Sequence, residues 1–295
     1  MIGLREIQTA AQRIEPYVRR TPLLECAELG VTVKAENLQP TGSFKVRGVF
    51  NALLCHEELP RGVATFSAGN AGAAVAYAAK RLGIPSIVVM RPGSVPEKVA
   101  AIRSHGGEIV FTEDLFGTCS ALCEERGFAL LHPFDDLDLI AGHGTIGLEI
   151  GAADLVVVPV GGGGLISGIA AAMPGTRVVG VEPATANNMT YALAAGRPDP
   201  LPHKPVSIAD GLTPPFSGEH TLEHVRALVA DVVEVSEQSI RDAWWPLMRA
   251  TRLLLEPSAV VGLAALRDGL IEPGERTVLV LSGGNSAELS PRASL

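Results

Sequence analysis

Short runs of β-branched and apolar residues alternate with alanine- and leucine-rich stretches along almost the whole chain of 295 residues. The runs have the length and composition of strands, and the stretches carry the apolar repeat of helices. Alternating strands and helices form βαβ units, in which the strands are parallel and helices cover both faces of the sheet. The predicted strands are residues 31–35, 63–66, 86–89, 108–111, 155–159, 177–181, 232–235 and 277–281. The pattern therefore predicts an α/β fold of open, mainly parallel sheets, with helices such as residues 71–82, 96–104, 165–173 and 240–253.

Composition and charge exclude several classes of protein. Hydrophobic residues make up 47% of the chain, which is enough for a buried core. The net charge of −8 repels a phosphate backbone, so we expect no nucleic-acid partner. Residues 1–21 form a charged amphipathic pattern rather than a signal peptide, and no apolar run is long enough to cross a membrane. The four cysteines lack zinc-site spacing and are expected to be reduced thiols. We therefore expect a soluble, cytoplasmic protein with no membrane partner.

A glycine-rich loop follows the buried strand at residues 155–159. Gly161, Gly162, Gly163 and Gly164 lead into Leu165 and a helix. Glycines let backbone N–H groups approach an anion closely, and the N-terminal end of a helix adds partial positive charge. By itself the loop fits a single phosphate, a dinucleotide with Glu182 as the ribose-binding acid, or a tight packing turn.

Lys45 lies in the segment P-T-G-S-F-K-V-R-G, directly after a turn at residues 40–42. We expect a helix to begin at Phe44 with Ser43 as its cap, which places Lys45 in the first helical turn. The helix dipole and the apolar neighbours there disfavour the ammonium form, and a neutral lysine amine can form a Schiff base. For an isolated lysine, a solvated surface position would be the simpler interpretation.

Two further strand ends carry small polar residues. Residues 67–70, S-A-G-N, lie between a predicted strand and a predicted helix, where N–H groups and side chains can bind a carboxylate. Ser282 begins S-G-G-N after the last predicted strand and can contact the edge of a flat ring. Each segment alone is equally well explained as an ordinary turn.

Seven short motifs occur in a fixed order, and the set is far more specific than any one of them. They are P-T-G-S-F-K-x-R-G, S-A-G-N, A-G-x-G-T-I-x-L-E at residues 141–149, G-G-G-G-L, A-D-G-L at 209–212, E-P-S-A at 256–259, and S-G-G-N. With these motifs the chain resembles, over residues 14–285, the threonine/serine dehydratase family of the tryptophan-synthase-β-like, fold-type-II enzymes. The resemblance implies two open parallel-sheet α/β domains with pyridoxal 5′-phosphate (PLP) in the cleft between them.

The resemblance also implies how PLP is bound. Lys45 would carry it as a Schiff base and would then move the α-proton of the substrate. Gly161–Gly164 and Leu165 would hold the phosphate, Asn70 would bind the ring O3′, and Ser282 would face the pyridine nitrogen. A neutral hydroxyl at that nitrogen favours elimination over transamination.

The implied substrate is a small amino acid whose carboxylate is bound by Ser67, Ala68, Gly69 and Asn70. The implied reaction removes water and then ammonia from L-threonine or L-serine and gives a 2-keto acid. Racemases of this group have a serine at the position of Ala68, so racemisation is not expected as the main reaction.

The chain departs from the family pattern S-x-G-N-H-A-Q-G, because Ala71 and Ala73 replace its His and Gln. The carboxylate pocket therefore loses polar donors and gains room, which leaves open which amino acid binds. His143 replaces a glutamine of the family pattern, and we interpret it as a packing or supporting residue.

Some relatives bind Mg²⁺ or Ca²⁺ at a segment that matches residues 182–188 here. Glu182 and the Ala186 carbonyl are oxygen ligands of the right kind, and Asn188 replaces a second carboxylate, which weakens a site for a hard cation. The alternative is that Glu182 is simply an acid at the end of a strand.

We expect a large PLP-binding domain, residues 1–59 and 139–295, and a small inserted domain, residues 60–138, that binds the substrate carboxylate. The resemblance implies a homodimer. The chain stops ten residues after Asn285, so no C-terminal regulatory domain is expected. The alternative functions are another PLP β-elimination, β-replacement or racemase reaction on this fold, an NAD-dependent oxidoreductase, and a non-catalytic binder of PLP or an amino acid.

Overall fold

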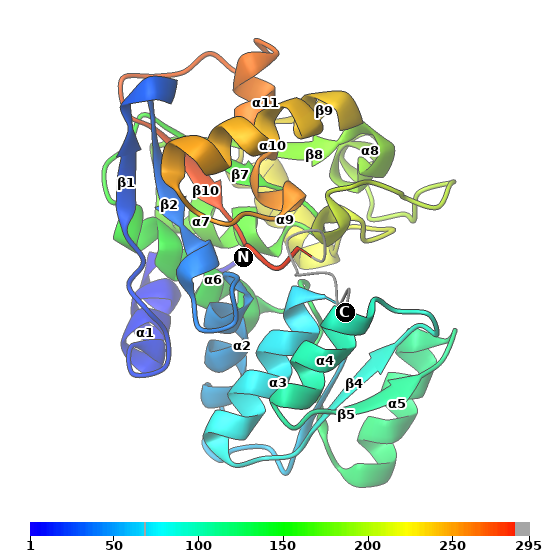
Figure 1. Ribbon diagram of the computed structural model, residues 1–295. Helices are drawn as coiled ribbons and strands as arrows, with labels where there is room; N and C mark the ends of the chain where they lie inside the picture. The colour runs from blue at the N-terminus through cyan, green and yellow to red at the C-terminus, as the bar shows by residue number, and fades with distance from the viewer. Residues whose placement is uncertain (68, 287–295) are drawn as a thin grey trace, which may run out of the picture.

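The computed structural model describes residues 1–67 and 69–286, and its strands form two open sheets (Figure 1). The larger sheet has the strand order β1-β2-β10-β7-β8-β9, and only the β1–β2 pair is antiparallel. Its strands are β1 (Leu23–Cys26), β2 (Val31–Ala35), β7 (Leu155–Pro159), β8 (Arg177–Pro183), β9 (Asp231–Val235) and β10 (Thr277–Leu281). This arrangement confirms the predicted α/β fold with mainly parallel sheet.

The smaller sheet is parallel throughout and has the order β5-β4-β3-β6. Its strands are β3 (Val63–Phe66), β4 (Ser86–Met90), β5 (Glu108–Phe111) and β6 (Ala129–Leu130). In Figure 1 it lies below the larger sheet, with α5 on one side and α3 and α4 on the other. Separate apolar clusters fill these two faces, one around Cys119 and Cys123 of α5 and one around Ala76 of α3 and Ile102 of α4.

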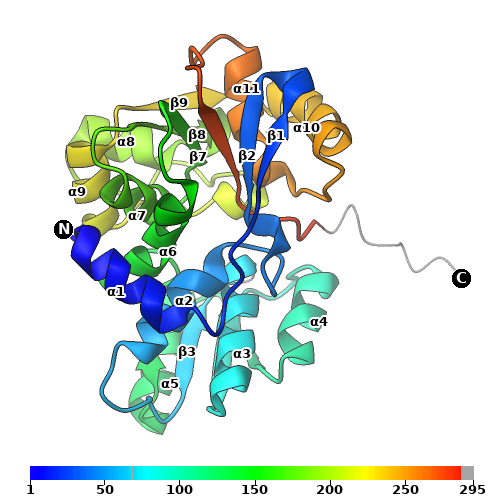
Figure 2. The same cartoon turned by 90° about the vertical axis from the view of Figure 1, so that its left-hand side faces the viewer.

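Helices surround the two sheets, and both faces of the larger sheet are covered. The helices are α1 (Leu4–Ile14), α2 (Lys45–Leu54), α3 (Asn70–Leu82), α4 (Pro96–Ser104), α5 (Leu115–Arg126), α6 (Leu137–Ile150), α7 (Gly164–Ala172), α8 (Asn188–Ala195), α9 (Glu219–Leu228), α10 (Glu237–Thr251) and α11 (Val261–Arg267). Residues of α10 and α11 pack on one face, and residues of α1, α6, α7, α8 and α9 pack on the other. Figure 2 shows α1 along the outside of α6.

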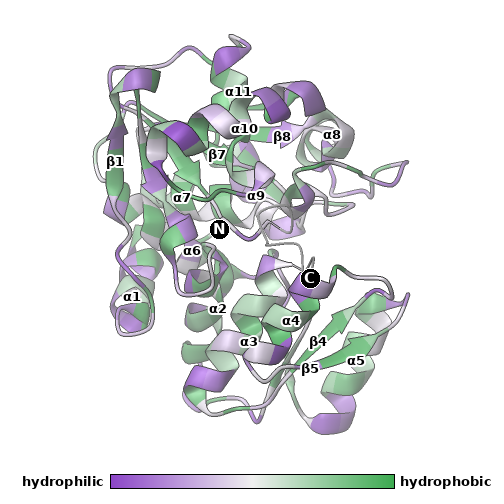
Figure 3. Cartoon of the chain, in the orientation of Figure 1, coloured by the Kyte–Doolittle hydropathy of each residue, from purple (hydrophilic) through white to green (hydrophobic). Residues whose placement is uncertain are grey.

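Strand β7 explains why its sequence is apolar throughout. Leu155 and Val157 point into the core on the α10–α11 side, whereas Val156 and Val158 point into the core on the α6–α7 side. Side chains alternate along a strand, so both faces of β7 are covered by helices and neither tolerates polar residues. In Figure 3 the central strands are coloured as hydrophobic, and several of the surrounding helices carry hydrophilic segments.

Helices α2 and α6 cross closely because glycines face each other at the contact. A Cβ on Gly142 would lie 2.7 Å from the Gly48 Cα, and a Cβ on Gly48 would collide with the His143 ring. The crossing connects the two sheets, because α2 also packs against α3 beside the smaller sheet. Among the helices of residues 1–67 and 69–286, none is long and apolar enough to cross a membrane.

Candidate active site

One cavity of about 1420 Å³ lies between the two sheets, where loops follow the carboxyl ends of β2, β3, β7 and β10. Open α/β sheets bind ligands at this edge, because the loops of several parallel strands meet there. The predicted site residues that line the cavity are Lys45, Ser67, Gly69, Asn70, Gly161, Gly162, Gly163, Gly164, Leu165 and Ser282. Ala68 lies outside the described residues. The four predicted site segments therefore meet at one place.

Lys45 is the first residue of α2 and points its amine into this cavity. Its Nζ donates a hydrogen bond of 2.7 Å to the Pro133 carbonyl and lies 5.1 Å from the centre of the Phe44 ring. Burial lowers the pKa of Lys45 to about 8. At pH 7 roughly a tenth of such amines is uncharged, far more than for a solvated lysine. An amine of this kind can act as a nucleophile or as a base near neutral pH.

The expected helix cap at Ser43 is wrong. Helix α2 begins at Lys45, one residue later than predicted, and its cap position makes no side-chain hydrogen bond. Ser43 instead forms an isolated antiparallel bridge with Gly283, and the Phe44 N–H donates to the Ser282 carbonyl at 3.1 Å. These contacts hold residues 43 and 44 against the S-G-G-N segment, which prevents the chain from adopting a cap geometry at Ser43.

A buried ionic network lies beneath Lys45, on the opposite side of α2. The Arg47 guanidinium donates two hydrogen bonds to Glu36, at 2.8 and 2.9 Å, and two to Glu149, at 2.7 and 2.8 Å. Lys34 also pairs with Glu149. The charges of Arg47 and Lys34 hold the pKa of Glu36 below its usual value despite complete burial of the carboxyl. The network links α2 to β2 and α6, and local sequence patterns did not reveal it.

The glycine loop offers unpaired backbone donors. No N–H group of residues 161–165 donates a hydrogen bond to another residue within the described ranges. Gly163 has a φ of +92°, which a glycine adopts without strain, and α7 begins at the next residue. The loop therefore combines free donors with a helix N-terminus, and this arrangement fits a phosphate group.

Glu182 has no access to that loop. It does not line the cavity, and its two carboxylate oxygens accept hydrogen bonds from the N–H groups of Met189 (3.1 Å) and Thr190 (2.8 Å). The acid that a dinucleotide ribose would need is therefore engaged at the start of α8. Ala186 is fully buried and also lies away from the cavity.

Asn70 contacts Glu256, a carboxylate that was not predicted to be a site residue. Its Nδ2 donates to both oxygens of Glu256, at 2.9 and 3.1 Å, and its Oδ1 accepts from Asn285 Nδ2 at 2.9 Å. Burial raises the pKa of Glu256 to about 7, and the nearby Asp210 acts in the same direction. Glu256 lies in the E-P-S-A motif, but only the tertiary contact with Asn70 gives it a position in the site.

His143 is completely buried and does not line the cavity. Its ring meets the Phe44 ring edge to face at 4.7 Å, and within the described residues neither ring nitrogen has a hydrogen-bond partner. Burial lowers the pKa of His143 well below its usual value, so the ring is neutral. It supports Phe44, the neighbour of Lys45, by packing.

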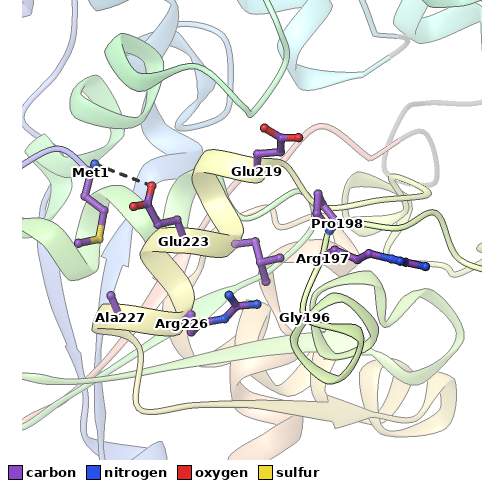
Figure 4. Close-up of a pocket in the computed structure, with 9 residues that line it drawn as sticks. Met1, Gly196, Arg197, Pro198, Glu219, Glu223, Arg226 and Ala227 are labelled. Carbon is purple, nitrogen blue, oxygen red and sulfur yellow. Dashed lines mark ion pairs between the residues drawn. The ribbon is translucent and has the colours of Figure 1, made fainter.

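A second, smaller depression of about 430 Å³ lies beside α9 (Figure 4). The N-terminal amine of Met1 pairs there with Glu223 at 3.9 Å, and Arg197 and Arg226 also line it. None of the predicted site residues that the structure describes lies in this depression. The large cavity is therefore the candidate active site.

Comparisons with known proteins identify the family of the chain. The family described as "Pyridoxal-phosphate dependent enzyme" matches residues 14–283. The chain is 41% identical to an L-threonine ammonia-lyase of Geobacter sulfurreducens, over 97% of this chain and 76% of that protein.

Two solved structures have nearly the same backbone. A threonine deaminase from T.th. superposes with a TM-score of 0.93 at 39% identity, over 98% of this chain and all of the other. Maize serine racemase superposes with a TM-score of 0.90 at 35% identity, over 96% and 94% of the two chains.

Proposed function

Because the chain belongs to the pyridoxal-phosphate-dependent enzymes and is a lyase of that family, we propose that it removes water and then ammonia from a 3-hydroxy amino acid, such as L-threonine or L-serine, and releases a 2-keto acid. One observation carries the proposal. A lysine amine of lowered pKa shares a cavity with a loop of unpaired N–H groups and with the N-terminus of α3. These groups match, in that order, a carbonyl cofactor, its phosphate and the carboxylate of an amino acid.

The residues that would hold PLP are all on the cavity lining. Lys45 would bind it covalently, the N–H groups of residues 161–165 would hold the phosphate, Asn70 would bind the ring hydroxyl, and Ser282 would meet the pyridine nitrogen. When bound, PLP supplies an electron sink that makes the α-proton of the amino acid acidic. Ser282 contributes a neutral hydroxyl there, which suits an elimination.

Residues of the chain would carry out the proton transfer and bind the substrate. The Lys45 amine would remove the proton from Cα, because its lowered pKa leaves part of it uncharged at neutral pH. The Pro133 carbonyl, 2.7 Å from Nζ, orients the amine. Ser67 and the first N–H groups of α3 would bind the substrate carboxylate, assisted by the positive end of the helix. Ala71 and Ala73 add no polar donor, so this backbone surface must supply most of the binding.

The experiment that tests the proposal is release of 2-keto acid from L-threonine and L-serine by the PLP-loaded protein. We expect steady release of 2-oxobutanoate or pyruvate together with an equal amount of ammonia. A protein that binds PLP and turns yellow but releases no keto acid from any 3-hydroxy amino acid would contradict the proposed reaction while leaving the cofactor assignment intact.

We also propose that the cavity divides the chain into the two predicted domains, residues 1–59 with 139–295 and residues 60–138. The smaller sheet supports this division, because its strands all lie between residues 63 and 130. Ser67 and Asn70 then belong to the small domain, and closure of that domain would exclude water from the bound amino acid.

We propose a divalent cation, Mg²⁺ or Ca²⁺, at Glu182 and the Ala186 carbonyl, with Asn188 at the position of a second carboxylate. The support is that Asn188 is fully buried and neither amide atom has a partner within the described residues. Each Glu182 carboxylate oxygen accepts one N–H group and keeps a further lone pair for a cation.

Millimolar Mg²⁺ or Ca²⁺ is expected to raise the thermal unfolding midpoint by about 2 °C or more, because a ligand that binds only the folded state stabilises it. Asn188→Ala should remove the shift. Equal midpoints with the cation and with the chelator EDTA would refute the site.

We propose a cytoplasmic location and a homodimer as well. The location is supported by Cys26, Cys55, Cys119 and Cys123, which are all free thiols, since a reducing compartment preserves such thiols. The homodimer rests on the family resemblance, and the molecular mass in solution tests it.

A further inference from the structure

One wall of the active-site cavity is aromatic. This aromatic wall consists of Phe66, Phe116, His132, Phe134 and Phe216, and its four phenylalanines are half of the eight in the chain. Each ring meets the next edge to face, so that the rings form one row. The centroid distances are 5.6 Å for Phe66–Phe116, 5.2 Å for Phe66–His132, 4.6 Å for His132–Phe134 and 5.8 Å for Phe134–Phe216. Such contacts make a continuous apolar surface.

The middle of the aromatic wall lies beside the Lys45 amine. Pro133, between His132 and Phe134, provides the carbonyl that accepts the hydrogen bond from Lys45. The Phe134 ring also lies against the phosphate-binding loop, because a Cβ on Gly162 would collide with it. From there the ring contacts lead to Phe116 on α5 in one direction and to Phe216, before α9, in the other.

Packing within the protein does not account for the whole wall. Phe116 is 58% exposed, and Phe66 and Phe216 are only half-buried, although all three line a cavity. Rings that served only the core would be covered by other side chains. Apolar surface that stays open in a concave site gains most when a ligand covers it.

The cavity has room for a large side chain. Its volume of about 1420 Å³ must hold PLP together with the amino acid, and it lies above the roughly 300–1,000 Å³ of a pocket for one drug-sized ligand. Ala71 and Ala73 contribute to that volume, because both line the cavity and neither extends beyond Cβ.

The charges on the lining do not suit an acidic side chain. Apart from Lys45, the Arg and Lys residues of the described lining are Arg91, which pairs with Glu113 at 3.0 Å, and Lys98, which pairs with Asp210. Glu97 and Asp114 add further negative charge to the same cavity. An additional carboxylate on the substrate would be repelled rather than bound.

From these observations we infer that the substrate is a 3-hydroxy amino acid with an aryl or bulky apolar group on Cβ, of which 3-phenylserine is the simplest aromatic example. The inference rests on the proposed function and names the substrate class. The aromatic wall holds the Cβ substituent, the N-terminus of α3 holds the carboxylate, and Lys45 faces Cα between them.

The same bonds break and form with this larger substrate as with L-threonine or L-serine. The Cα–H and Cβ–O bonds break, and the hydroxyl leaves as water. The unsaturated amino acid that remains takes up a proton on Cβ, and water then replaces its nitrogen, which leaves as ammonia. For 3-phenylserine the products are phenylpyruvate and ammonia, with no net consumption of water.

The test compares two amino acids that lack a β-hydroxyl and so cannot lose water. L-Phenylalanine should bind the PLP-loaded protein about tenfold or more tightly than L-alanine in isothermal titration calorimetry, because its ring is covered by the aromatic wall. In parallel, kcat/KM for 3-phenylserine should exceed that for L-threonine by about tenfold or more.

Phe116→Ala and Phe216→Ala should each reduce the ratio of the two binding constants by about fivefold or more. Phe111→Ala is the matched control, because Phe111 is a half-exposed phenylalanine on β5 that does not line the cavity, and it should leave the ratio unchanged. The ratio cancels a partial loss of folded protein, since both ligands report on the same sample.

Equal or weaker binding of L-phenylalanine overturns the inference, as does an equal effect of Phe111→Ala and Phe116→Ala. The outcome also separates this inference from the proposed reaction. Keto acid from L-threonine without any preference for aromatic ligands refutes the inference alone. A strong preference for L-phenylalanine without keto acid from any substrate refutes the reaction, and with it the 3-hydroxy amino acid as substrate, but leaves the aromatic wall as the binding site of the side chain.

Discussion

Lys45→Ala is expected to lower 2-keto acid release by about 10³-fold or more, because it removes both the covalent anchor of the cofactor and the base at Cα. The rate of keto acid formation at saturating PLP measures the loss. Borohydride reduction supplies a second readout, since it should attach the cofactor permanently to the peptide that contains Lys45 in the unaltered protein and leave the variant unlabelled.

Lys80→Ala is the matched control for Lys45→Ala. Lys80 is a solvent-exposed lysine of α3, and its Nζ donates to the Ser104 carbonyl at 3.2 Å, outside the cavity. Its loss should change the rate less than about twofold, as for most surface substitutions. If Lys45→Ala retained a tenth of the activity, or if another lysine carried the label, the assignment of Lys45 would be wrong.

Arg47→Met is expected to lower the free energy of unfolding by about 3–5 kcal/mol. The Arg47 guanidinium is fully buried and serves Glu36 and Glu149 through four hydrogen bonds. Methionine fills much of the volume but leaves the two carboxylates with Lys34 as their one neighbouring cation among residues 1–67 and 69–286. Breaking a buried pair costs more than the pair contributes, because the remaining charge keeps its desolvation penalty.

Urea unfolding of the PLP-free protein measures this loss as a lower midpoint. Arg126→Met is the control, because the Arg126–Glu108 pair is exposed on both sides and should contribute less than about 1 kcal/mol. The double variant Arg47→Met/Glu36→Gln should recover part of the stability, since it removes one of the stranded charges. Similar midpoints for Arg47→Met and Arg126→Met would show that the network contributes little.

The strands were largely predictable from the sequence. All eight predicted strands form, because apolar β-branched runs between turns have few other ways to bury their side chains. Strands β1 and β6 were not predicted. β6 has two residues, and β1 is a partly exposed edge strand of four. Neither has the length or pattern that identifies a strand without its partners.

The meeting of the four motifs followed from topology as much as from the motifs. The carboxyl ends of the parallel strands β2, β7 and β10 point to one edge of the larger sheet, so the segments that follow them approach one another. The segment after β3 belongs to the smaller sheet, and the packing of the two sheets brings it to the same cavity. The details were not predictable. Ser43 was expected to cap α2, but its bridge to Gly283 depends on a residue 240 positions later in the chain.

Local periodicity and short motifs in a fixed order were enough to predict the fold class and to propose the cofactor-binding segments and the reactive lysine. The partners of these segments became visible only in the folded chain. Glu256 reached Asn70, Arg47 joined two distant carboxylates, and four phenylalanines from separate segments formed one wall of the cavity. Such contacts depend on how elements far apart in the chain pack together, and packing of that kind leaves no periodic signal in the sequence.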